Sequence, residues 1–227
     1  MFKDIKEQFP IFKNKTNGKE LVYLDSANSS QKPQTVIDAV SNFYSNEFAN
    51  VGRGIYSLAV NASEKYELTR SNLKSFIGAS DDYEIVFTKN ATESLNLVAS
   101  CFAEKFIEEG DEIILTEVEH HANYVPWHYL RKRKGAIIKF LPIDENGDLK
   151  VDELEKLISK KTKIISVTHM SNVTGSITPL KEIISIAKKY NIPVSVDGTQ
   201  GAAHLELDIK ELDCDFYSFS GHKMYGP

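Results

Sequence analysis

The sequence predicts an α/β fold in which helices flank a mostly parallel sheet. Apolar runs of strand length alternate along the chain with segments whose apolar residues recur at helical spacing, and this alternation is typical of such sheets. The runs are continuous and rich in β-branched residues, as in strands that are covered on both faces. With 227 residues, of which 41% are hydrophobic, the chain is long enough to bury a core of this kind.

The first part of the chain predicts a different organisation. Residues 1–20 are expected to form an N-terminal arm that begins with a short amphipathic segment. Residues 21–24 predict an extended piece, and two long helical patterns follow at about 33–47 and 59–77. We expect residues 21–227 to form one large domain.

The second part of the chain supplies the strands of the predicted sheet. They are expected at each continuous apolar run, over residues 84–87, 112–115, 136–140, 163–167, 193–196 and 215–219. Amphipathic helices lie between them and begin near Ala91, Asn123, Val151 and Leu180.

Composition and charge argue against several classes of partner. The net charge is −5, without the basic excess that nucleic-acid binding requires. No apolar run reaches transmembrane length, and the first residues lack a signal-peptide core, so we expect a cytoplasmic protein that does not bind membranes. Cys101 and Cys214 lie in mainly apolar segments, which predicts buried, reduced thiols.

Two polar residues at predicted strand ends indicate a specific chemistry. Lys223 follows a strand within a loop of small and polar residues, where a lysine is placed to form a Schiff base. Asp197 ends another strand, and a buried carboxylate there is unfavourable unless it is paired. An imine-forming amine and an acid that binds a protonated pyridine nitrogen are the fixed points of pyridoxal phosphate (PLP) chemistry. Taken singly, each also has a simpler explanation, a surface lysine and a cap for the turn after Asp197.

Other polar segments follow further predicted strands. Ala91 and Thr92 open a helix, whose N-terminus suits a phosphate, although an ordinary helix cap explains the same residues. His120 and His121 point to opposite faces and predict no metal site, but one of them could stack on a planar cofactor. Asn172 could bind a substrate carboxylate or could bond the backbone of its own turn.

Several motifs carry a resemblance to a known family. They cover residues 23–27, 31–33, 91–99, 119–123, 125–127, 168–175, 196–200 and 212–227. In this order they resemble the cysteine desulfurases of the class V aminotransferase superfamily, which are fold-type I PLP enzymes. The closest likeness is to the SUF-type subgroup, which includes selenocysteine lyase-like members. The resemblance implies the large domain of a fold-type I PLP-dependent transferase.

The resemblance also implies roles at the cofactor ring. Lys223 would bind PLP covalently and later move the α-proton of the substrate. Asp197 would hold the pyridine nitrogen, and Gln200 would contact the phenolic oxygen. His120 would stack on the ring and act in proton transfer.

Further roles concern the phosphate and the substrate. The phosphate would be held by the side chains of Thr92, Ser220 and His222 and by backbone N–H groups of the turn at Ala91. Asn172 would help to bind the carboxylate of the amino-acid substrate. Together with the ring contacts, these residues form the expected site.

The implied reaction removes sulfur from L-cysteine as an enzyme persulfide and releases L-alanine, for iron–sulfur cluster assembly. A homodimer and a sulfur-acceptor protein are the implied partners. The family's persulfide-forming cysteine and its substrate-binding arginines are expected beyond residue 227, so we expect a truncated chain that lacks the small C-terminal domain and is inactive as given. Selenocysteine lyase, another class V aminotransferase or lyase, and a non-catalytic PLP-binding fragment are the alternatives.

Overall fold

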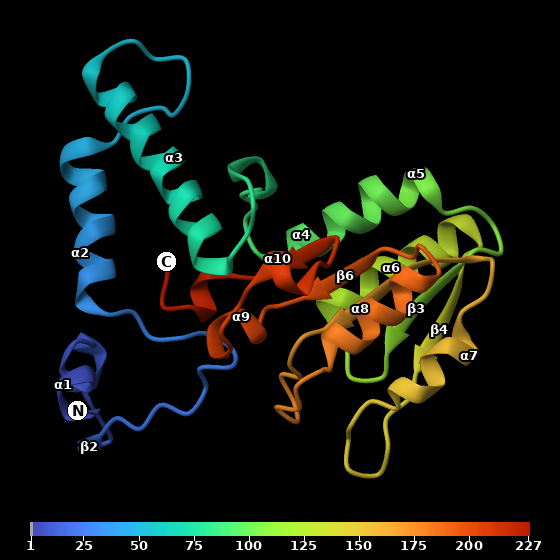
Figure 1. The fold of residues 1–227 in the computed structure, drawn as a ribbon. Helices are drawn as coiled ribbons and strands as arrows, with labels where there is room; N and C mark the ends of the chain where they lie inside the picture. Colours follow the sequence, from blue (N-terminus) through green and yellow to red (C-terminus); the bar gives the residue numbers. More distant parts are fainter. Residues whose placement is uncertain (1) are drawn as a thin grey trace. The chain divides into compact units, whose positions relative to one another are not determined.

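A computed structural model describes residues 2–227, with side chains described from Asp4 onward. The chain forms two compact units (Figure 1). The first comprises the described part of Met1–Phe76 together with Ser80–Ile85 and Gly221–Pro227. The second comprises Ile77–Ala79 and Val86–Ser220. Met1, the first residue of the predicted arm, lies outside the described residues.

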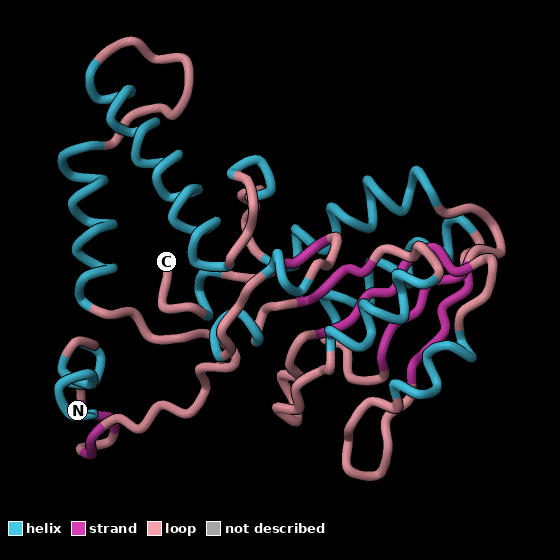
Figure 2. The backbone as a smooth tube through the Cα atoms, viewed as in Figure 1, coloured by secondary structure: helices cyan, strands magenta, loops and turns pink. Residues whose placement is uncertain are grey.

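The second unit contains a parallel sheet of five strands in the order β4-β3-β5-β6-β7. The strands are β3 (Glu112–Thr116), β4 (Ile137–Leu141), β5 (Thr162–Thr168), β6 (Val194–Asp197) and β7 (Phe216–Ser218). Figure 2 shows them side by side, and every neighbouring pair is parallel. Each strand lies within one residue of a predicted one, and the predicted α/β fold is confirmed.

Helices connect and cover these strands. They are α4 (Ala91–Leu97), the π-helical η4 (Val98–Ala103), α5 (Glu104–Phe106), α6 (His121–Lys134), the 3-10 turn η5 (Val151–Glu153), α7 (Leu154–Leu157), α8 (Leu180–Lys189), α9 (Gly201–His204) and α10 (Ile209–Leu212). The four predicted helix starts are each confirmed to within two residues.

The sheet has an apolar core on each face, because side chains alternate along a strand. Ile114 of β3 packs with Ile183 of α8 in one core, which also takes in Leu154 of α7. Ile113, its neighbour in β3, belongs to the other core together with Trp127 of α6. Apolar side chains therefore cover both faces of the sheet.

One predicted strand is wrong. Glu84 ends the 3-10 turn η3 (Asp82–Glu84), and Ile85 is extended, but residues 84–87 pair with no strand of the described chain. Val86 is accordingly 65% exposed. An apolar β-branched run becomes a strand only where a neighbouring strand satisfies its backbone groups, and residues 84–87 have no such neighbour in this structure.

The first unit is mainly helical. Its elements are α1 (Phe2–Glu7), the 3-10 turn η1 (Pro10–Lys13), β1 (Lys15–Thr16), β2 (Lys19–Glu20), α2 (Gln34–Asn42), the π-helical η2 (Phe43–Glu47), most of α3 (Ser57–Ile77), η3 and the 3-10 turn η6 (Gly221–Lys223). The two predicted long helices are confirmed as α2 with η2 and as α3. Residues 21–24, which were predicted to form an extended piece, belong to no helix and to no sheet of the described chain.

The prediction of two buried thiols is wrong for Cys101, which is exposed, whereas Cys214 is partly buried. Cys101 lies in η4 beside the exposed Ser100, whereas Val98, Ala99 and Ala103 of the same helix are buried. The apolar composition of a segment does not reveal which side of its helix a given residue occupies.

No helix in the described part of the chain combines the length and the apolar character that crossing a membrane requires.

Candidate active site

Asp197 is the last residue of β6 and lies at the carboxyl-terminal end of the parallel strands, where it is 3% exposed. Its Oδ1 accepts hydrogen bonds from the backbone N–H of Thr199 at 3.0 Å and from the Thr199 hydroxyl at 2.5 Å. No described residue donates to Oδ2. The carboxylate therefore stabilises its own turn with one oxygen and keeps the other for a ligand, so the cap and the binding role are compatible.

The turn after Asp197 packs tightly against two aromatic side chains. A Cβ atom at Gly198 would overlap the ring of Tyr217, and one at Gly201 would overlap the imidazole of His169. His169 Nδ1 and the Tyr217 hydroxyl lie 2.8 Å apart in a hydrogen bond. Burial lowers the pKa of His169 and strongly raises the pKa of Tyr217, so both rings are held neutral.

Sequence reasoning did not identify this pair. The feature of the sequence that could have indicated this pair is the presence of the two glycines that flank the turn, since glycine has no side chain and allows a neighbouring group to approach closely. Gln200, which lies between them, is 5% exposed and precedes α9.

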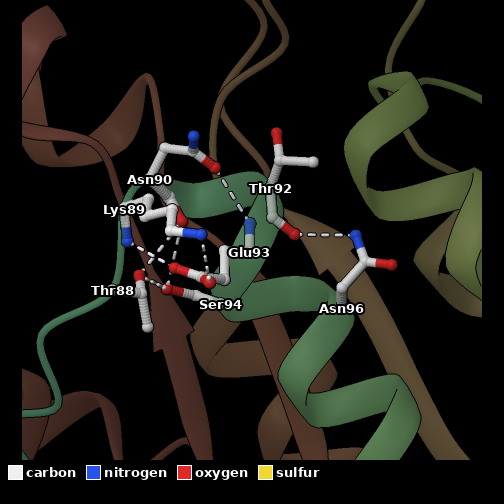
Figure 3. Close-up of polar contacts among 7 residues, drawn as sticks. All are labelled: Thr88, Lys89, Asn90, Thr92, Glu93, Ser94 and Asn96. Atoms are coloured by element: carbon white, nitrogen blue, oxygen red, sulfur yellow. Dashed lines mark hydrogen bonds and ion pairs between the residues drawn. The ribbon is translucent and has the colours of Figure 1, made fainter.

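The N-terminus of α4 is a well-capped helix start (Figure 3). Asn90 Oδ1 accepts from the backbone N–H of Glu93 at 2.9 Å, while Glu93 reaches back to the backbone N–H of Lys89. The backbone N–H of Ala91 donates to the hydroxyl of Ser220 at 2.8 Å, which ties this helix to the residue that follows β7 by two positions. Asn90 thus supplies the ordinary helix cap that was considered for this segment.

Thr92 is the residue of this helix start that remains available to a ligand. Its side chain is exposed, and Figure 3 shows its hydroxyl pointing away from the cap. As the second residue of the helix, its backbone N–H has no acceptor within the helix. A free N–H and a hydroxyl at the positive end of a helix suit an anion.

His120 caps the helix that follows β3. Its Nδ1 accepts from the backbone N–H of Ala122 at 3.1 Å, and its ring is exposed. This bond orients the ring through Nδ1 and does not use its other nitrogen, Nε2. This capping role was not predicted, and it orients the side chain for which stacking was predicted.

Glu119, the residue before His120, is a second carboxyl group of this edge that sequence reasoning missed. It accepts hydrogen bonds from the Thr116 hydroxyl at 2.5 Å, the Thr168 backbone N–H at 2.8 Å and the Asn123 side chain at 2.7 Å. Desolvation raises the pKa of Glu119 to about 7 in spite of these bonds, and the charge of Asp197 adds to the rise. The group thus joins the ends of β3 and β5 to the start of α6.

Asn172 is exposed in the turn after β5. The turn is closed by Ser171, whose hydroxyl accepts from the backbone N–H groups of Val173 at 3.2 Å and Thr174 at 3.3 Å. Ser171 thus makes the backbone bonds that were considered for Asn172, and the amide of Asn172 is left to face solvent.

His222 and Lys223 lie in η6, within the first unit. Both are partly buried. Burial lowers the pKa of His222, and the charges of Lys223 and Lys32 add to this effect. His222 Nδ1 lies 3.2 Å from the hydroxyl of Ser29, so the imidazole is anchored by residues from the beginning of the chain.

Comparison with known proteins gives a consistent result. A family model described as aminotransferase class-V matches residues 22–227. A probable cysteine desulfurase of Halalkalibacterium halodurans is 46% identical over 224 residues, which are 99% of this chain and 55% of that protein. The chain therefore spans about half the length of this curated relative.

Solved structures agree with the sequence relatives. The cysteine desulfurase CsdA of Escherichia coli superposes with a TM-score of 0.89 at 40% identity, over 99% of this chain and 55% of its own. A cysteine desulfurase of Thermococcus onnurineus gives a TM-score of 0.91 at 38% identity, over 99% of this chain and 54% of its own.

Proposed function

Because this chain belongs to the class-V aminotransferase family, we propose that its protein is a cysteine desulfurase that uses PLP. The observation that carries the proposal is Asp197, a buried carboxylate with one oxygen free at the carboxyl edge of a parallel sheet. Ligands of open α/β sheets bind at this edge. The names of the relatives at 38–46% identity support the choice of reaction.

The donor set of this chain fits PLP. The cofactor carries a phosphate and a pyridine nitrogen, and it acts as an electron sink for the bonds at the substrate α-carbon when bound. The start of α4 offers the amide and hydroxyl of Thr92 to the phosphate, beside Ala91 and Ser220, which are linked by their hydrogen bond at 2.8 Å. Asp197 offers an anionic acceptor to a pyridine N–H.

The remaining residues of the proposed site have distinct tasks. Asp197 keeps the ring nitrogen protonated, because its negative charge stabilises the N–H that it accepts. Gln200 contacts the phenolic oxygen, and His222 contributes to the phosphate contacts. The ring of His120 covers the cofactor, and its second nitrogen moves a proton. Asn172 donates its amide to the substrate carboxylate.

Lys223 is proposed to be the covalent attachment point and the base at the substrate α-carbon. Residues 21–227 would form the PLP-binding large domain, preceded by an arm of residues 1–20. The cysteine that takes up sulfur and the arginines that bind the substrate carboxylate are proposed to lie beyond residue 227.

We also propose the finer assignments that the motifs imply. The protein would belong to the SUF-type subgroup, act as a cytoplasmic homodimer and pass persulfide sulfur to an acceptor protein for iron–sulfur cluster assembly. L-cysteine is preferred to selenocysteine as the substrate, because the relatives are named for desulfuration of cysteine.

The test uses the protein at its full natural length with L-cysteine and an excess of dithiothreitol, which reduces the enzyme persulfide to thiol and sulfide, and it measures alanine and sulfide together. We expect equal amounts of both products, and we expect Lys223→Ala to lower turnover by at least about a thousandfold and to abolish the visible absorbance of the bound cofactor. Lys15→Gln, at an exposed position of β1, is the matched control and should leave both unchanged. Selenide production from selenocysteine without sulfide from cysteine would favour a selenocysteine lyase. Full turnover by Lys223→Ala would refute the assignment of Lys223 as the attachment point of the cofactor.

A further inference from the structure

The backbone carbonyl of His222 directly precedes Lys223 and is bound by one segment of the N-terminal region. It accepts from the backbone N–H of Ser30 at 3.0 Å, from the Ser30 hydroxyl at 3.0 Å and from Lys32 Nζ at 2.7 Å, and the Ser29 hydroxyl is a fourth, longer donor at 3.4 Å. A carbonyl oxygen has two lone pairs, so the three shorter bonds already more than satisfy it. The peptide group before Lys223 is therefore held from several directions by residues about 190 positions away.

Ser30 also binds the far side of the same loop. Its hydroxyl accepts from the backbone N–H of Tyr225 at 2.8 Å. The loop closes on itself through bonds from the N–H groups of Met224 at 2.9 Å and Gly226 at 3.0 Å to the carbonyl of Gly221. One serine thus bonds the backbone on both sides of Lys223.

Tyr225 has a backbone conformation that needs such support. Its φ angle is +64°, and a bulky side chain in the left-handed region is unfavourable. Its amide is bound by Ser30, and its ring meets that of Phe9 with centroids 5.9 Å apart. Loops of this kind keep an unfavourable conformation where the surroundings determine it, and they gather at functional sites.

The segment that binds the loop is itself well fixed. Ser30 is 4% exposed. The hydroxyl of Tyr23 donates to the carbonyl of Ser29 at 2.6 Å and approaches that of Asp25 at 3.3 Å. Lys32 is partly buried, and this burial lowers the pKa of its side chain.

We propose that Ser30 and Lys32 are positioning residues that hold the loop of Lys223 in the conformation needed to attach the cofactor. The inference rests on the proposed function, in which Lys223 is the attachment point. A charged donor on a carbonyl makes a stronger bond than a neutral one, and the three bonds restrict the peptide group from which the Lys223 side chain departs. Neither residue touches the cofactor in this account, since both act through the backbone.

The first experiment measures amide hydrogen exchange, resolved to single residues, in the full-length protein. Ser30→Ala should speed exchange at Tyr225 by roughly three- to tenfold, because its acceptor is lost. Lys32→Gln should speed exchange at Met224 in the same range, and Lys15→Gln should change neither. Unchanged exchange at both amides in both variants would overturn the proposal.

The second experiment follows attachment directly. Cofactor-free protein is mixed with PLP, reduced with borohydride at successive times, and the labelled peptide is mapped. We expect labelling at Lys223 to slow by about tenfold in Ser30→Ala and Lys32→Gln, while Lys32→Arg, which keeps a charged donor, restores most of the rate.

The two readouts separate the possible failures. Labelling at the parent rate in Ser30→Ala and Lys32→Gln would overturn the positioning role, even with faster exchange. Absence of any label at Lys223 in the parent protein would refute the proposed function, and the exchange rates would still decide whether Ser30 and Lys32 hold the loop.

Discussion

Two carboxyl groups at the carboxyl edge of the sheet differ in the way their oxygens are used. Asp197 directs one oxygen to Thr199 and has no described partner on the other. Glu119 accepts from three donors on both of its oxygens. The first arrangement suits a group that binds a ligand, and the second suits a group that holds structure together, because both of its oxygens are already bonded within the protein.

Glu119 should make the stability of the protein depend on pH. Its pKa is about 7 in the folded protein against 4.5 for the free side chain, so the folded state retains a proton that the unfolded chain releases. Its contribution to the free energy of unfolding is complete below pH 4.5 and is lost as the pH rises to about 7. The free energy of unfolding should fall by on the order of 3 kcal/mol over this range.

The variant Glu119→Gln should remove this component, so the free energy of unfolding should fall less between pH 4.5 and 7 than in the parent protein. Urea unfolding at a series of pH values measures it. All other titrating groups are shared by the two proteins, so parallel pH profiles would contradict the raised pKa.

Gly198 is predicted to be a position where a single methyl group is harmful. Its Cβ would overlap the ring of Tyr217, and relief requires either the ring or the turn after Asp197 to move. We expect Gly198→Ala to lower the free energy of unfolding by about 1–3 kcal/mol and to weaken PLP binding. In Gly221→Ala, where the nearest atom to the new Cβ lies 4.0 Å away, the unfolding midpoint should stay near that of the parent.

Neither cysteine of this chain is expected to take up sulfur. Burial raises the pKa of Cys214 to about 11, which leaves almost no thiolate near neutral pH, and the thiolate is the nucleophile. Cys101 is exposed, but it lies in η4, ten residues after the helix start at Ala91 that would bind the phosphate. Sulfide release by Cys101→Ser and Cys214→Ser should therefore match the parent within about twofold, and a large loss in either would identify an unforeseen acceptor.

At the scale of elements, the strands were predictable and their partners were not. Five continuous apolar runs became β3 to β7, and the strands inside the sheet are buried on both faces by the two apolar cores. Residues 84–87 have the same composition and form no strand, since pairing depends on a neighbour that local sequence does not specify.

The candidate site was predictable to a similar extent. Strand ends and helix starts identified Asp197, Thr92 and His120, because parallel strands bring their ends to one edge. The bonds from Ser30 to the carbonyl of His222 join residues 192 positions apart. Spacing and periodicity carry no information on such a contact, which explains why the support of this loop was missed.

The start of α4 gives an element-scale prediction. Asn90→Ala removes the acceptor for the backbone N–H of Glu93 and should lower the free energy of unfolding by about 1 kcal/mol. It should also weaken phosphate binding, because the first turn of the helix loosens. Asn96→Ala, which deletes a bond from a side chain to the Thr92 carbonyl but keeps the cap, is the control for both measurements. An equal loss in the two variants would argue against a specific role of the cap.

At the scale of the whole molecule, the first unit exposes an unusual amount of apolar surface. On α2, η2 and the loop before α3 the exposed side chains include Ile37 at 42%, Tyr44 at 68%, Phe48 at 62% and Ile55 at 98%. Single exposed apolar residues are ordinary, but a concentration of them on neighbouring elements marks a surface that binds a partner. The homodimer implied by the sequence motifs supplies a partner for it.

We therefore predict that the full-length protein is a dimer in which this surface is covered. Ile55→Asp and Tyr44→Asp should each raise the dimer dissociation constant by about thirtyfold or more, since an aspartate at a buried apolar contact loses the contact and leaves a charge without a partner. Sedimentation equilibrium measures the constant. Tyr129→Asp, at a position of α6 that is 65% exposed in the second unit, introduces the same charge elsewhere and should leave the constant unchanged. An equal dissociation constant in all three variants would mean that the apolar surface of the first unit faces something other than a second copy of this chain.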